Sequence, residues 1–417
     1  MFMSLPGSWY GLRRSLEAPA AGLPFGRRKK PRFCGATAVP TMESAPGPQT
    51  TIDGRTYLYF GGTGYLGLQG HPEVLQAACD AARRLGVGSA TSRLGVGTTP
   101  AVLAVERNAA AFFGLPAAVY LPSGYMTNHL LVLLLEGRFD LVLVDRFAHY
   151  SVREASRLAG RPVVEFEHCD AEDLSRRLRE HLAPGARPLV LTDGVFAAQG
   201  AIAPLPAYCR VLGAYPGSIL VVDDAHAIGV LGANGRGTLE HHGIARQGVN
   251  AVDPRGGPSG APEVFMGGTL SKAIGGYGGI VPGSDEFVGW AKGTSSHYAG
   301  SSPPPCPVAG ATAKALLLAA DPERRVRLSD NVSRVRTGLR RLGLDVPDSP
   351  VPVIPLHLGE AGHMRAIEQE LIRRGIFVPY MSRYAGLPPE GVLRLAVFAT
   401  HTPAMIERLL DELAKVL

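Results

Sequence analysis

Short apolar runs alternate with amphipathic stretches from about residue 75 onward. Nearly every residue in these runs is hydrophobic, Glu165 being the exception, and they lie at 119–121, 141–144, 163–166, 189–191, 219–222 and 264–266. Runs that are apolar on both faces are typical of strands buried in a parallel sheet. Between them, residues 171–181 and 206–212 show helical spacing of apolar positions. The alternation predicts right-handed crossovers and a mostly parallel, doubly wound sheet, hence an α/β fold.

Patterns near the two ends of the chain predict a hairpin and a terminal helix. Residues 50–60 alternate around Asp53-Gly54, which favours a β-hairpin. A proline run at 303–305 is expected to break the chain before a C-terminal part that ends in an amphipathic helix. Thr402 suits the N-cap of that helix, with Pro403 in its first turn.

These signals divide the chain into four parts. We expect residues 1–49 to form a basic N-terminal extension and residues 50–75 an arm that contains the hairpin. Residues 76–297 would form a large domain around the doubly wound sheet, and residues 298–417 a smaller α+β C-terminal domain.

Composition narrows the class of protein. Of 417 residues, 46% are hydrophobic and only 19% are charged, which is enough for one large core plus a smaller one and too apolar for a disordered chain. The most apolar stretch, residues 130–144, is interrupted by Glu136, Arg138 and Asp140. No span of a membrane is therefore expected.

Charge and cysteine usage bear on location and partners. The net charge is +6, and seven basic residues in the first 32 face a single acid, Glu17. Such a start is typical of an organellar transit peptide, a nucleic-acid arm or a flexible extension. No folded nucleic-acid reader accompanies it, so we expect a cytoplasmic enzyme that binds no nucleic acid, with organellar import left open.

The cysteines predict reduced thiols. They show no C-x-x-C pair and no histidine at the usual metal-ligand spacing, so no metal site is expected from them; they are Cys34, Cys79, Cys169, Cys209 and Cys306.

Several predicted strands end in polar or glycine-rich residues, which indicates one composite ligand site. In open α/β sheets, ligands bind at the carboxyl ends of the strands. Lys272 follows such a strand and is then surrounded by glycines, an arrangement that suits an amine able to form a Schiff base with a flat ligand. A surface lysine beside a flexible loop is the alternative.

Three further residues stand at strand ends. Asp223, with His226 three positions later, could keep a pyridine nitrogen protonated, although an aspartate pair that caps the next helix is also possible. A strand that turns through Gly124 into a helix start could present backbone N–H groups to a phosphate. His149 could stack on a flat ring or be an ordinary core histidine.

In combination, these segments resemble the α-oxoamine synthases, pyridoxal-phosphate enzymes with the aspartate-aminotransferase fold (fold type I) in the class II aminotransferase superfamily. The resemblance covers about residues 50–417, in the family's order. The matching segments are Tyr65–Leu68, Ser123–Tyr125, Asp145–His149, Thr192–Phe196, Asp223–His226, Gly235–Gly237, Glu240–Gly243, Thr269–Lys272, Leu393–Leu395 and Ala399–Thr402.

The resemblance implies a pyridoxal 5'-phosphate site. Lys272 would carry the cofactor as a Schiff base and later move the α-proton of the substrate. Asp223 would pair with the pyridine nitrogen, and His226 would contact the ring's phenolic oxygen. His149 would stack on the ring face.

Other residues would hold the phosphate and the substrate. The backbone at Gly124 and Tyr125, with the Thr269 hydroxyl, would bind the phosphate. Arg394 would bind the substrate carboxylate, a bidentate task that suits guanidinium geometry.

The implied activity is a condensation of an amino acid with an acyl thioester (acyl-CoA or acyl carrier protein), with decarboxylation to a 2-amino ketone. A homodimer with a composite active site is the expected assembly. Two alternatives stay open: an aminotransferase on the same fold, and a non-catalytic partner subunit, which would be expected to lack Lys272.

The chain departs from the family pattern at four places. Thr63-Gly64 replaces an asparagine-containing pair, and Gly97–Val102 lacks a histidine. Ala197 and Gln199 replace a serine and an aspartate, so a hydroxyl beside the phenolic oxygen is missing and His226 is expected to act there alone. Residues 384–389 replace a proline-rich stretch before Arg394. Because these changes lie on the substrate side, we expect an active enzyme with an unusual substrate.

Overall fold

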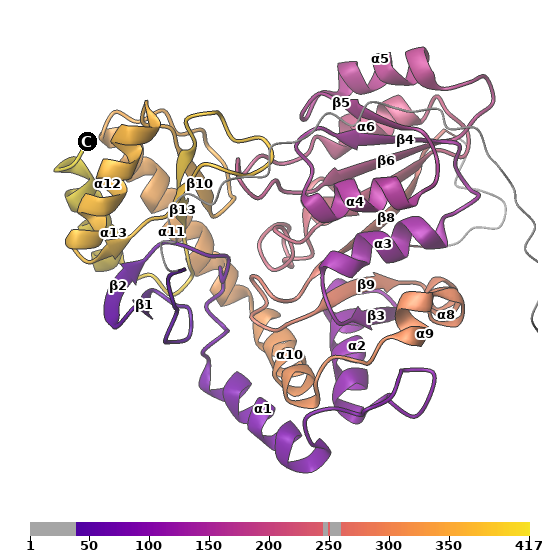
Figure 1. Cartoon of the computed structure of the whole chain (residues 1–417), viewed down its shortest axis with the longest axis horizontal. Helices are drawn as coiled ribbons and strands as arrows, with labels where there is room; N and C mark the ends of the chain where they lie inside the picture. Colours follow the sequence, from indigo (N-terminus) through magenta and orange to yellow (C-terminus); the bar gives the residue numbers. More distant parts are fainter. Residues whose placement is uncertain (1–38, 245–248, 251–259) are drawn as a thin grey trace, which may run out of the picture. The chain divides into compact units, whose positions relative to one another are not determined.

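The computed structural model describes residues 39–244, 249–250 and 260–417. Its largest sheet has seven strands in the order β3-β9-β8-β7-β6-β4-β5 (Figure 1). Strands β4 to β8 run parallel, and β9 is antiparallel to both β3 and β8. The strands are β3 (Ala117–Leu121), β4 (Leu141–Asp145), β5 (Val163–Phe166), β6 (Pro188–Asp193), β7 (Ile219–Asp223), β8 (Glu263–Thr269) and β9 (Gly279–Gly283).

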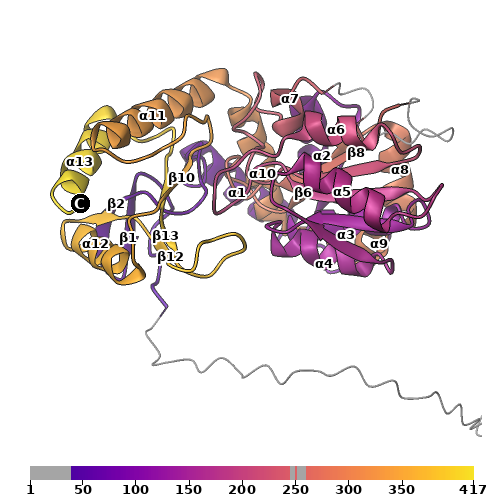
Figure 2. The same cartoon turned by 90° about the horizontal axis from the view of Figure 1, so that it is seen from above.

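Helices cover both faces of this sheet, because the strands are apolar on both sides. Val142 and Val144 pack with α3, α4 and α8, whereas Leu141 and Leu143 pack into the core on the opposite face, with α2, α5, α6 and α10. Figure 2 shows α3 and α4 on one side of the sheet and α6 on the other. The helices are α2 (Pro100–Phe113), α3 (Tyr125–Leu134), α4 (Tyr150–Leu158), α5 (Ala171–His181), α6 (Leu205–Leu212), α8 (Asp285–Thr294) and α10 (Cys306–Ala319).

All six predicted strands are present, but two details of the prediction were wrong. The run at 163–166 is not buried on both faces, because β5 is the edge strand of the sheet and Val163 is 38% exposed. Strand β9 was not predicted at all. Its sequence begins and ends in glycine and contains Pro282, a residue that strand interiors usually exclude.

The predicted hairpin is confirmed as β1 (Gln49–Ile52) and β2 (Arg55–Tyr59). Its turn residues, Asp53 and Gly54, both have positive φ, as a two-residue hairpin turn requires. Strand β11 (Ile376–Phe377) adds to β2 in parallel, so the N-terminal hairpin joins the C-terminal part of the chain.

The C-terminal part is built on a second small sheet. It has the order β10-β13-β12, with β10 (Val353–Leu356), β12 (Tyr380–Met381) and β13 (Val392–Ala396). Its helices are α11 (Pro322–Arg341), α12 (Ala361–Arg373) and α13 (Pro403–Ala414). Thr402 caps α13, since its hydroxyl accepts from the Met405 N–H at 3.3 Å, as predicted.

The remaining helices are α1 (Pro72–Leu85), α7 (Thr238–His241) and α9 (Ser296–Gly300). Helix α10, which follows the proline run, packs against α1 and α2. We keep the four-part domain division as a proposal. Among the helices of the described residues, none is both long enough and apolar enough to cross a membrane.

Candidate active site

Asp223 is the last residue of β7 and is buried with hydrogen-bond donors on both carboxylate oxygens. Its Oδ2 accepts from Asn128 Nδ2 at 2.6 Å and from the Ser151 hydroxyl at 3.5 Å, and its Oδ1 accepts from the Ala225 N–H at 3.0 Å. These donors compensate for the loss of water around a buried carboxylate. Asp223 can therefore hold a negative charge in the protein interior.

His149 caps the N-terminus of α4 and is tied to the same network. Its Nδ1 hydrogen-bonds with the Ser151 hydroxyl at 2.8 Å, and its backbone N–H donates to Asp193 Oδ2 at 2.7 Å. Burial lowers the pKa of His149, and the nearby Asp223 charge opposes that shift. His149 is thus fixed in place by its backbone N–H and by one nitrogen of its ring.

Asp193 is the last residue of β6 and stands directly beside Asp223 in the sheet register. Burial raises the pKa of Asp193 well above its usual value, and the adjacent Asp223 charge raises it further. Two carboxylates this close do not both ionise easily. Asp193 is therefore the carboxyl group of the two whose pKa is raised by its surroundings.

Lys272 lies three residues after the end of β8, and the charges of both of these carboxyl groups act on its amine. Burial lowers the pKa of Lys272 to about 8, while Asp223 and Asp193 act in the opposite direction. A lysine in this state is a neutral amine in an appreciable fraction of molecules near neutral pH, which an ordinary lysine is not. It can act as a nucleophile and as a base.

His226 is buried next to a hydroxyl that the sequence analysis gave no role. Its Nδ1 hydrogen-bonds with the Tyr65 hydroxyl at 2.9 Å. Burial lowers the pKa of His226 well below its usual value, and the charges of Lys272 and Arg394 add to the effect. Tyr65 is thus a second polar group beside His226, and the prediction that His226 acts alone on the phenolic oxygen stays a prediction.

Arg394 lies in β13 and reaches the same hydroxyl. It donates from Nε to the Ala197 carbonyl at 2.9 Å, from one terminal nitrogen to the Gly62 carbonyl at 3.0 Å, and from the other to the Tyr65 hydroxyl at 3.4 Å. A guanidinium has five N–H donors, so about two stay available for a ligand. The side chain is 6% exposed and is held in one position.

The start of α3 lies tightly against the end of β8. A Cβ atom built on Gly124 would stand 2.4 Å from the Cβ of Thr269, so only glycine fits there. The Thr269 hydroxyl contacts Ser271 Oγ at 2.8 Å, and the Tyr125 N–H donates to Ser123 Oγ at 3.2 Å. The aromatic ring of Tyr125 stands edge-on to His149, with ring centres 6.0 Å apart.

The structure thus brings the sequence-predicted residues into one connected region. Missing from the prediction were Tyr65, Asn128, Ser151 and Asp193, which hold or flank the predicted groups. The available signal was position alone: Tyr65 and Asp193 lie within matching segments, and Asn128 and Ser151 lie two or three residues after one.

Two of the departures from the family pattern form a single contact. Gln199 donates from Nε2 to the Ala385 carbonyl at 3.2 Å, and the ring of Tyr384 lies 6.1 Å from the ring of His149. Burial raises the pKa of Tyr384, and the neighbouring Asp193 adds to it. The loop at 384–389 therefore covers the side of the site where His149 lies.

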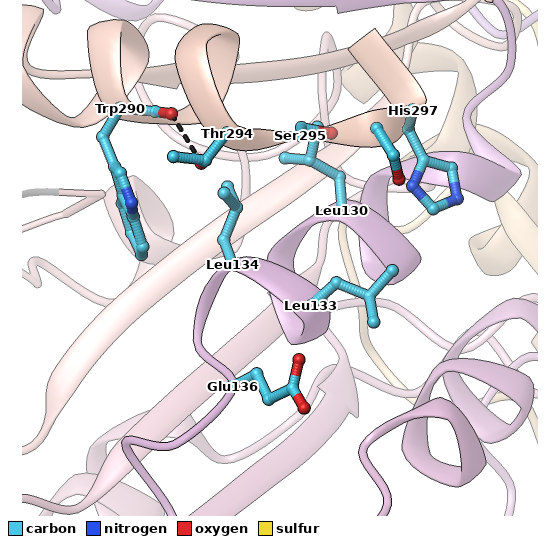
Figure 3. A pocket seen from close by; sticks show the side chains of 9 residues that line it. Leu130, Leu133, Leu134, Glu136, Trp290, Thr294, Ser295 and His297 are labelled. Carbon is cyan, nitrogen blue, oxygen red and sulfur yellow. Dashed lines mark hydrogen bonds between the residues drawn. The ribbon is translucent and has the colours of Figure 1, made fainter. Parts of the chain in front are cut away.

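A separate cavity of about 300 Å³ lies between α3, α8 and α9 (Figure 3). It is lined by leucines of α3, by Trp290 and by His297, and none of the predicted site residues lines it. His297 is linked to the site only through ring contacts, first with His129 at 6.3 Å and then from His129 to Tyr125 at 5.5 Å.

Comparisons with known proteins identify the family of this chain. The model of the aminotransferase class I and II family matches residues 57–413. The 8-amino-7-oxononanoate synthase of Cellvibrio japonicus is 37% identical over 377 residues, which cover 90% of each chain. The serine palmitoyltransferase of Sphingomonas wittichii has a TM-score of 0.81 at 26% identity, covering 90% of this chain and 91% of that one.

A high-resolution structure of serine palmitoyltransferase with pyridoxal phosphate gives the same TM-score, 0.81, at 26% identity and covers 91% of this chain and 92% of its own. The match spans nearly the whole length of both proteins. The chain belongs to the aminotransferase class I and II family, in its α-oxoamine synthase group.

Proposed function

We propose that this protein is a pyridoxal-phosphate-dependent C-acyltransferase that condenses an amino acid with an acyl thioester and releases carbon dioxide, giving a 2-amino ketone. The single observation that carries the proposal is Lys272, whose pKa is lowered to about 8 by burial while the charge of the buried Asp223 carboxylate acts in the opposite direction. Relatives 37% identical over 90% of the chain are named for such a synthase.

The residues of the site fit pyridoxal phosphate. The cofactor needs an amine for its aldehyde, an anion for its ring nitrogen and room for its phosphate. Lys272 and Asp223 meet the first two needs. Because Gly124 has no Cβ, the backbone at the start of α3 lies next to the Thr269 hydroxyl. Backbone N–H groups at a helix start together with a hydroxyl suit an anion such as the phosphate.

When bound, the cofactor supplies an electron-withdrawing ring that stabilises the electron pair left on an amino acid's α-carbon after proton loss. The protein has to hold that ring flat and keep its nitrogen protonated. Asp223 does the second task, because its charge is held by Asn128, Ser151 and the Ala225 N–H. His149, fixed by Ser151 and Asp193, would cover the ring face.

Lys272 carries the proton at Nζ. Its lowered pKa allows the amine to accept a proton near neutral pH and to return it later to the same face of the substrate. Asp223 and Asp193 counter the effect of burial, so the protonated form is also accessible. An amine that can exist in both forms suits a proton carrier.

Arg394 and the 384–389 loop position the substrate. The free N–H donors of Arg394 bind a carboxylate in a bidentate manner, and Tyr65 keeps the guanidinium next to neutral His226. Tyr384 excludes water from the side of His149. The Gln199–Ala385 contact sets where this loop lies and thereby how much room an amino-acid side chain has.

The proposed assembly is a homodimer located in the cytoplasm. Its support is a segment between α1 and α2 in which Leu94 is 61% exposed and Val96 91% exposed, an apolar surface suited to a second copy. Sedimentation of Leu94→Asp and Val96→Asp variants tests it, with Val326→Asp on α11 as the exposed control. The cytoplasmic location is supported by Cys79, Cys169, Cys209 and Cys306, which are free thiols.

The deciding experiment measures thiol release from a panel of acyl thioesters by the holoenzyme, with glycine, alanine or serine added in turn. We expect release that requires both the amino acid and Lys272, together with carbon dioxide. The Lys272→Ala variant should lose it, whereas Lys314→Ala, on the surface of α10, should not. Keto-acid formation without thiol release would replace this proposal with an aminotransferase.

A further inference from the structure

A second group of chemistry-bearing side chains lies at the ends of β4 and β5, outside the catalytic machinery. Asp145 is the last residue of β4, and His168 and Cys169 lie between β5 and α5. The ligand atoms of these three side chains lie within 4.8 Å of one another. The spacing analysis of the cysteines missed the group, because Asp145 enters it from another strand.

The distance between His168 and Cys169 suits one metal ion. His168 Nε2 lies 3.6 Å from Cys169 Sγ. Zinc binds imidazole nitrogen at about 2.0–2.1 Å and thiolate sulfur at about 2.3 Å, and a tetrahedral angle between such ligands separates them by about 3.6 Å. The two side chains therefore already have the separation of zinc ligands.

Asp145 orients the histidine. Its Oδ1 accepts from His168 Nδ1 at 3.1 Å, which leaves Nε2 with a lone pair directed toward Cys169. Histidines that bind metals usually donate their other N–H to a carboxylate in this way. Asp145 is itself fixed by the backbone N–H groups of Phe147 at 2.8 Å and Cys169 at 2.9 Å.

Tyr208 supplies an independent sign that something belongs in this space. Its side chain is fully buried, yet its hydroxyl has no hydrogen-bond partner among the described residues. Tyr208 belongs to the hydrophobic cluster against which Cys169 packs. Burial raises the pKa of Tyr208, and the charges of Cys169 and Asp145 add to that shift. A buried hydroxyl without a partner is costly, and a bound ion with its water would satisfy it.

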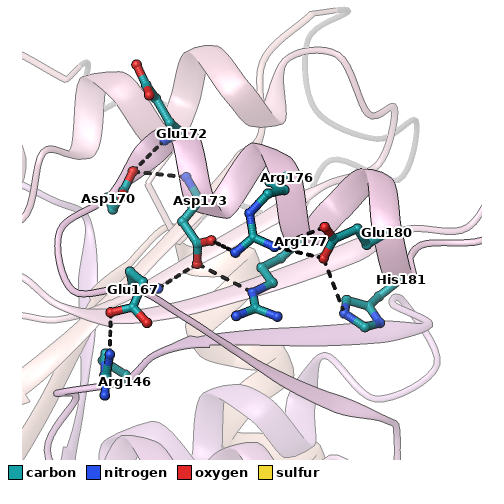
Figure 4. A network of polar contacts seen from close by, with 9 residues as sticks. All are labelled: Arg146, Glu167, Asp170, Glu172, Asp173, Arg176, Arg177, Glu180 and His181. Carbon is teal, nitrogen blue, oxygen red and sulfur yellow. Dashed lines mark hydrogen bonds and ion pairs between the residues drawn. The ribbon is translucent and has the colours of Figure 1, made fainter.

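The segment that carries His168 and Cys169 is held rigidly. Asp170 accepts from the N–H groups of Glu172 at 2.8 Å and Asp173 at 2.9 Å, and Asp173 accepts from the Glu167 N–H at 2.8 Å (Figure 4). Cys169 has a φ of 55°, a left-handed conformation that side chains other than asparagine and aspartate rarely adopt. The thiol is thus kept next to His168 at some cost in backbone strain.

We propose that His168 and Cys169, oriented by Asp145 and completed by Tyr208 through water, bind one divalent cation of the zinc class. A thiolate and an imidazole are the donors that such ions prefer. The buried carboxylate of Asp145, which accepts from the Cys169 N–H at 2.9 Å, favours a cation there. The site does not depend on the cofactor or on the proposed synthase activity.

The test is a titration of the holoenzyme with Zn²⁺ at micromolar concentration against a chromophoric chelator, repeated with Co²⁺ to record thiolate–metal absorption. Cys169→Asn removes the thiol with a residue that tolerates the left-handed backbone, so the fold should survive. His168→Gln removes the other donor. Cys209→Ser, which changes another half-buried free cysteine, is the matched control.

We expect about one Zn²⁺ per chain in the wild type and in Cys209→Ser, and at least tenfold weaker binding in Cys169→Asn and His168→Gln. The cobalt–thiolate absorption should disappear in Cys169→Asn. Absence of binding by the wild type, or equal binding by Cys169→Asn, overturns the proposal. Circular dichroism checks that both variants are folded, and thiol release measured in parallel keeps the fate of the synthase proposal separate.

Discussion

Two buried histidines in different parts of the molecule allow a direct comparison. His226 follows β7 in the active site, and His401 lies just before α13 in the C-terminal part. Burial lowers the pKa of both, that of His401 to about 4, so both are neutral at neutral pH. They differ in what their ring nitrogens contact.

Both ring nitrogens of His401 are used by the backbone. Its Nδ1 accepts from the Phe398 N–H at 3.0 Å and its Nε2 donates to the Tyr59 carbonyl at 3.0 Å, with the Phe60 ring stacked at 4.1 Å. His226 bonds only through Nδ1, to Tyr65, and its Nε2 has no bond within the described part of the chain. Burial alone therefore does not mark a functional histidine, whereas unused bonding capacity beside Lys272 does.

This comparison predicts opposite effects of mutation in the two regions. In the active site, polar groups keep donors or acceptors free for ligands, so substitutions should reduce the reaction rate and change stability little. Both ring nitrogens of His401 are used internally, so substitutions of His401 should reduce the free energy of unfolding and leave the rate unchanged.

The largest effect is expected for Lys272→Ala. The change removes both the nucleophile and the proton carrier, so turnover should fall by at least about 10⁴-fold. The apoprotein should be as stable as the wild type or more stable, because a buried amine of lowered pKa is lost. Thiol release and thermal unfolding measure the two quantities. A stable variant that retains a tenth of the activity would contradict the role of Lys272.

Asp223→Asn should have the next largest effect. The amide keeps the shape and can still accept from Asn128, but it cannot balance a protonated ring nitrogen. We expect turnover to fall by about 10²- to 10³-fold, as when one preorganised electrostatic group is removed from an active site. Asp80→Asn, on the exposed face of α1, is the control. A loss of stability that fully accounts for the lost activity would place Asp223 with His401, among the structural residues.

His401→Gln tests the other side of the comparison. In the unfolded chain the histidine binds a proton below pH 6.5, but in the folded protein only below about 4. As the pH falls from 6.5 to about 4, the unfolded chain gains a proton that the folded protein does not, so the free energy of unfolding decreases. At 1.36 kcal/mol per pKa unit, the decrease reaches about 3 kcal/mol.

Glutamine does not titrate, so the variant does not lose stability through this protonation as the pH falls. At pH 7 it should be less stable than the wild type, by about 1–3 kcal/mol for the disrupted buried hydrogen bonds, and the difference should narrow as pH falls toward 4. Chemical unfolding at several pH values measures the trend, with His363→Gln on exposed α12 as control. A constant difference across this range would show that His401 titrates normally.

The sequence predicts strands best where apolar residues occupy both faces. Strands β3 to β8 were found from such runs, because burial between two helix layers leaves few polar positions. Strand β9 could not be found, since Gly279 and Pro282 carry no strand signal and the strand exists through its pairing with β3 and β8. The exposure of Val163 follows from the position of β5 at the sheet edge, which no local pattern encodes.

The site shows the same division. Lys272, Asp223 and His149 could be predicted to lie together because each stands at the end of a strand or within four residues of it, and parallel strand ends meet at one edge. The contacts of Tyr65 with His226 and of Gln199 with Ala385 join residues 161 and 186 positions apart. Contacts between parts so distant in sequence depend on the complete tertiary packing, and so does the approach of Asp145 to Cys169.

Thr402→Ala is expected to have the smallest effect, and it compares an exposed cap residue with the buried histidine next to it. Thr402 is adjacent to His401 but exposed, and its one role in the structure is to accept from the Met405 N–H at the start of α13. Loss of such a cap should cost about 1 kcal/mol of unfolding free energy, with no change in turnover and no change in the pH trend assigned to His401. Thr402→Ser should restore most of the loss, because serine caps equally well. If Thr402→Ala instead lowered the rate, the C-terminal part would be coupled to catalysis. The residues around His401 could then not be treated as purely stabilising.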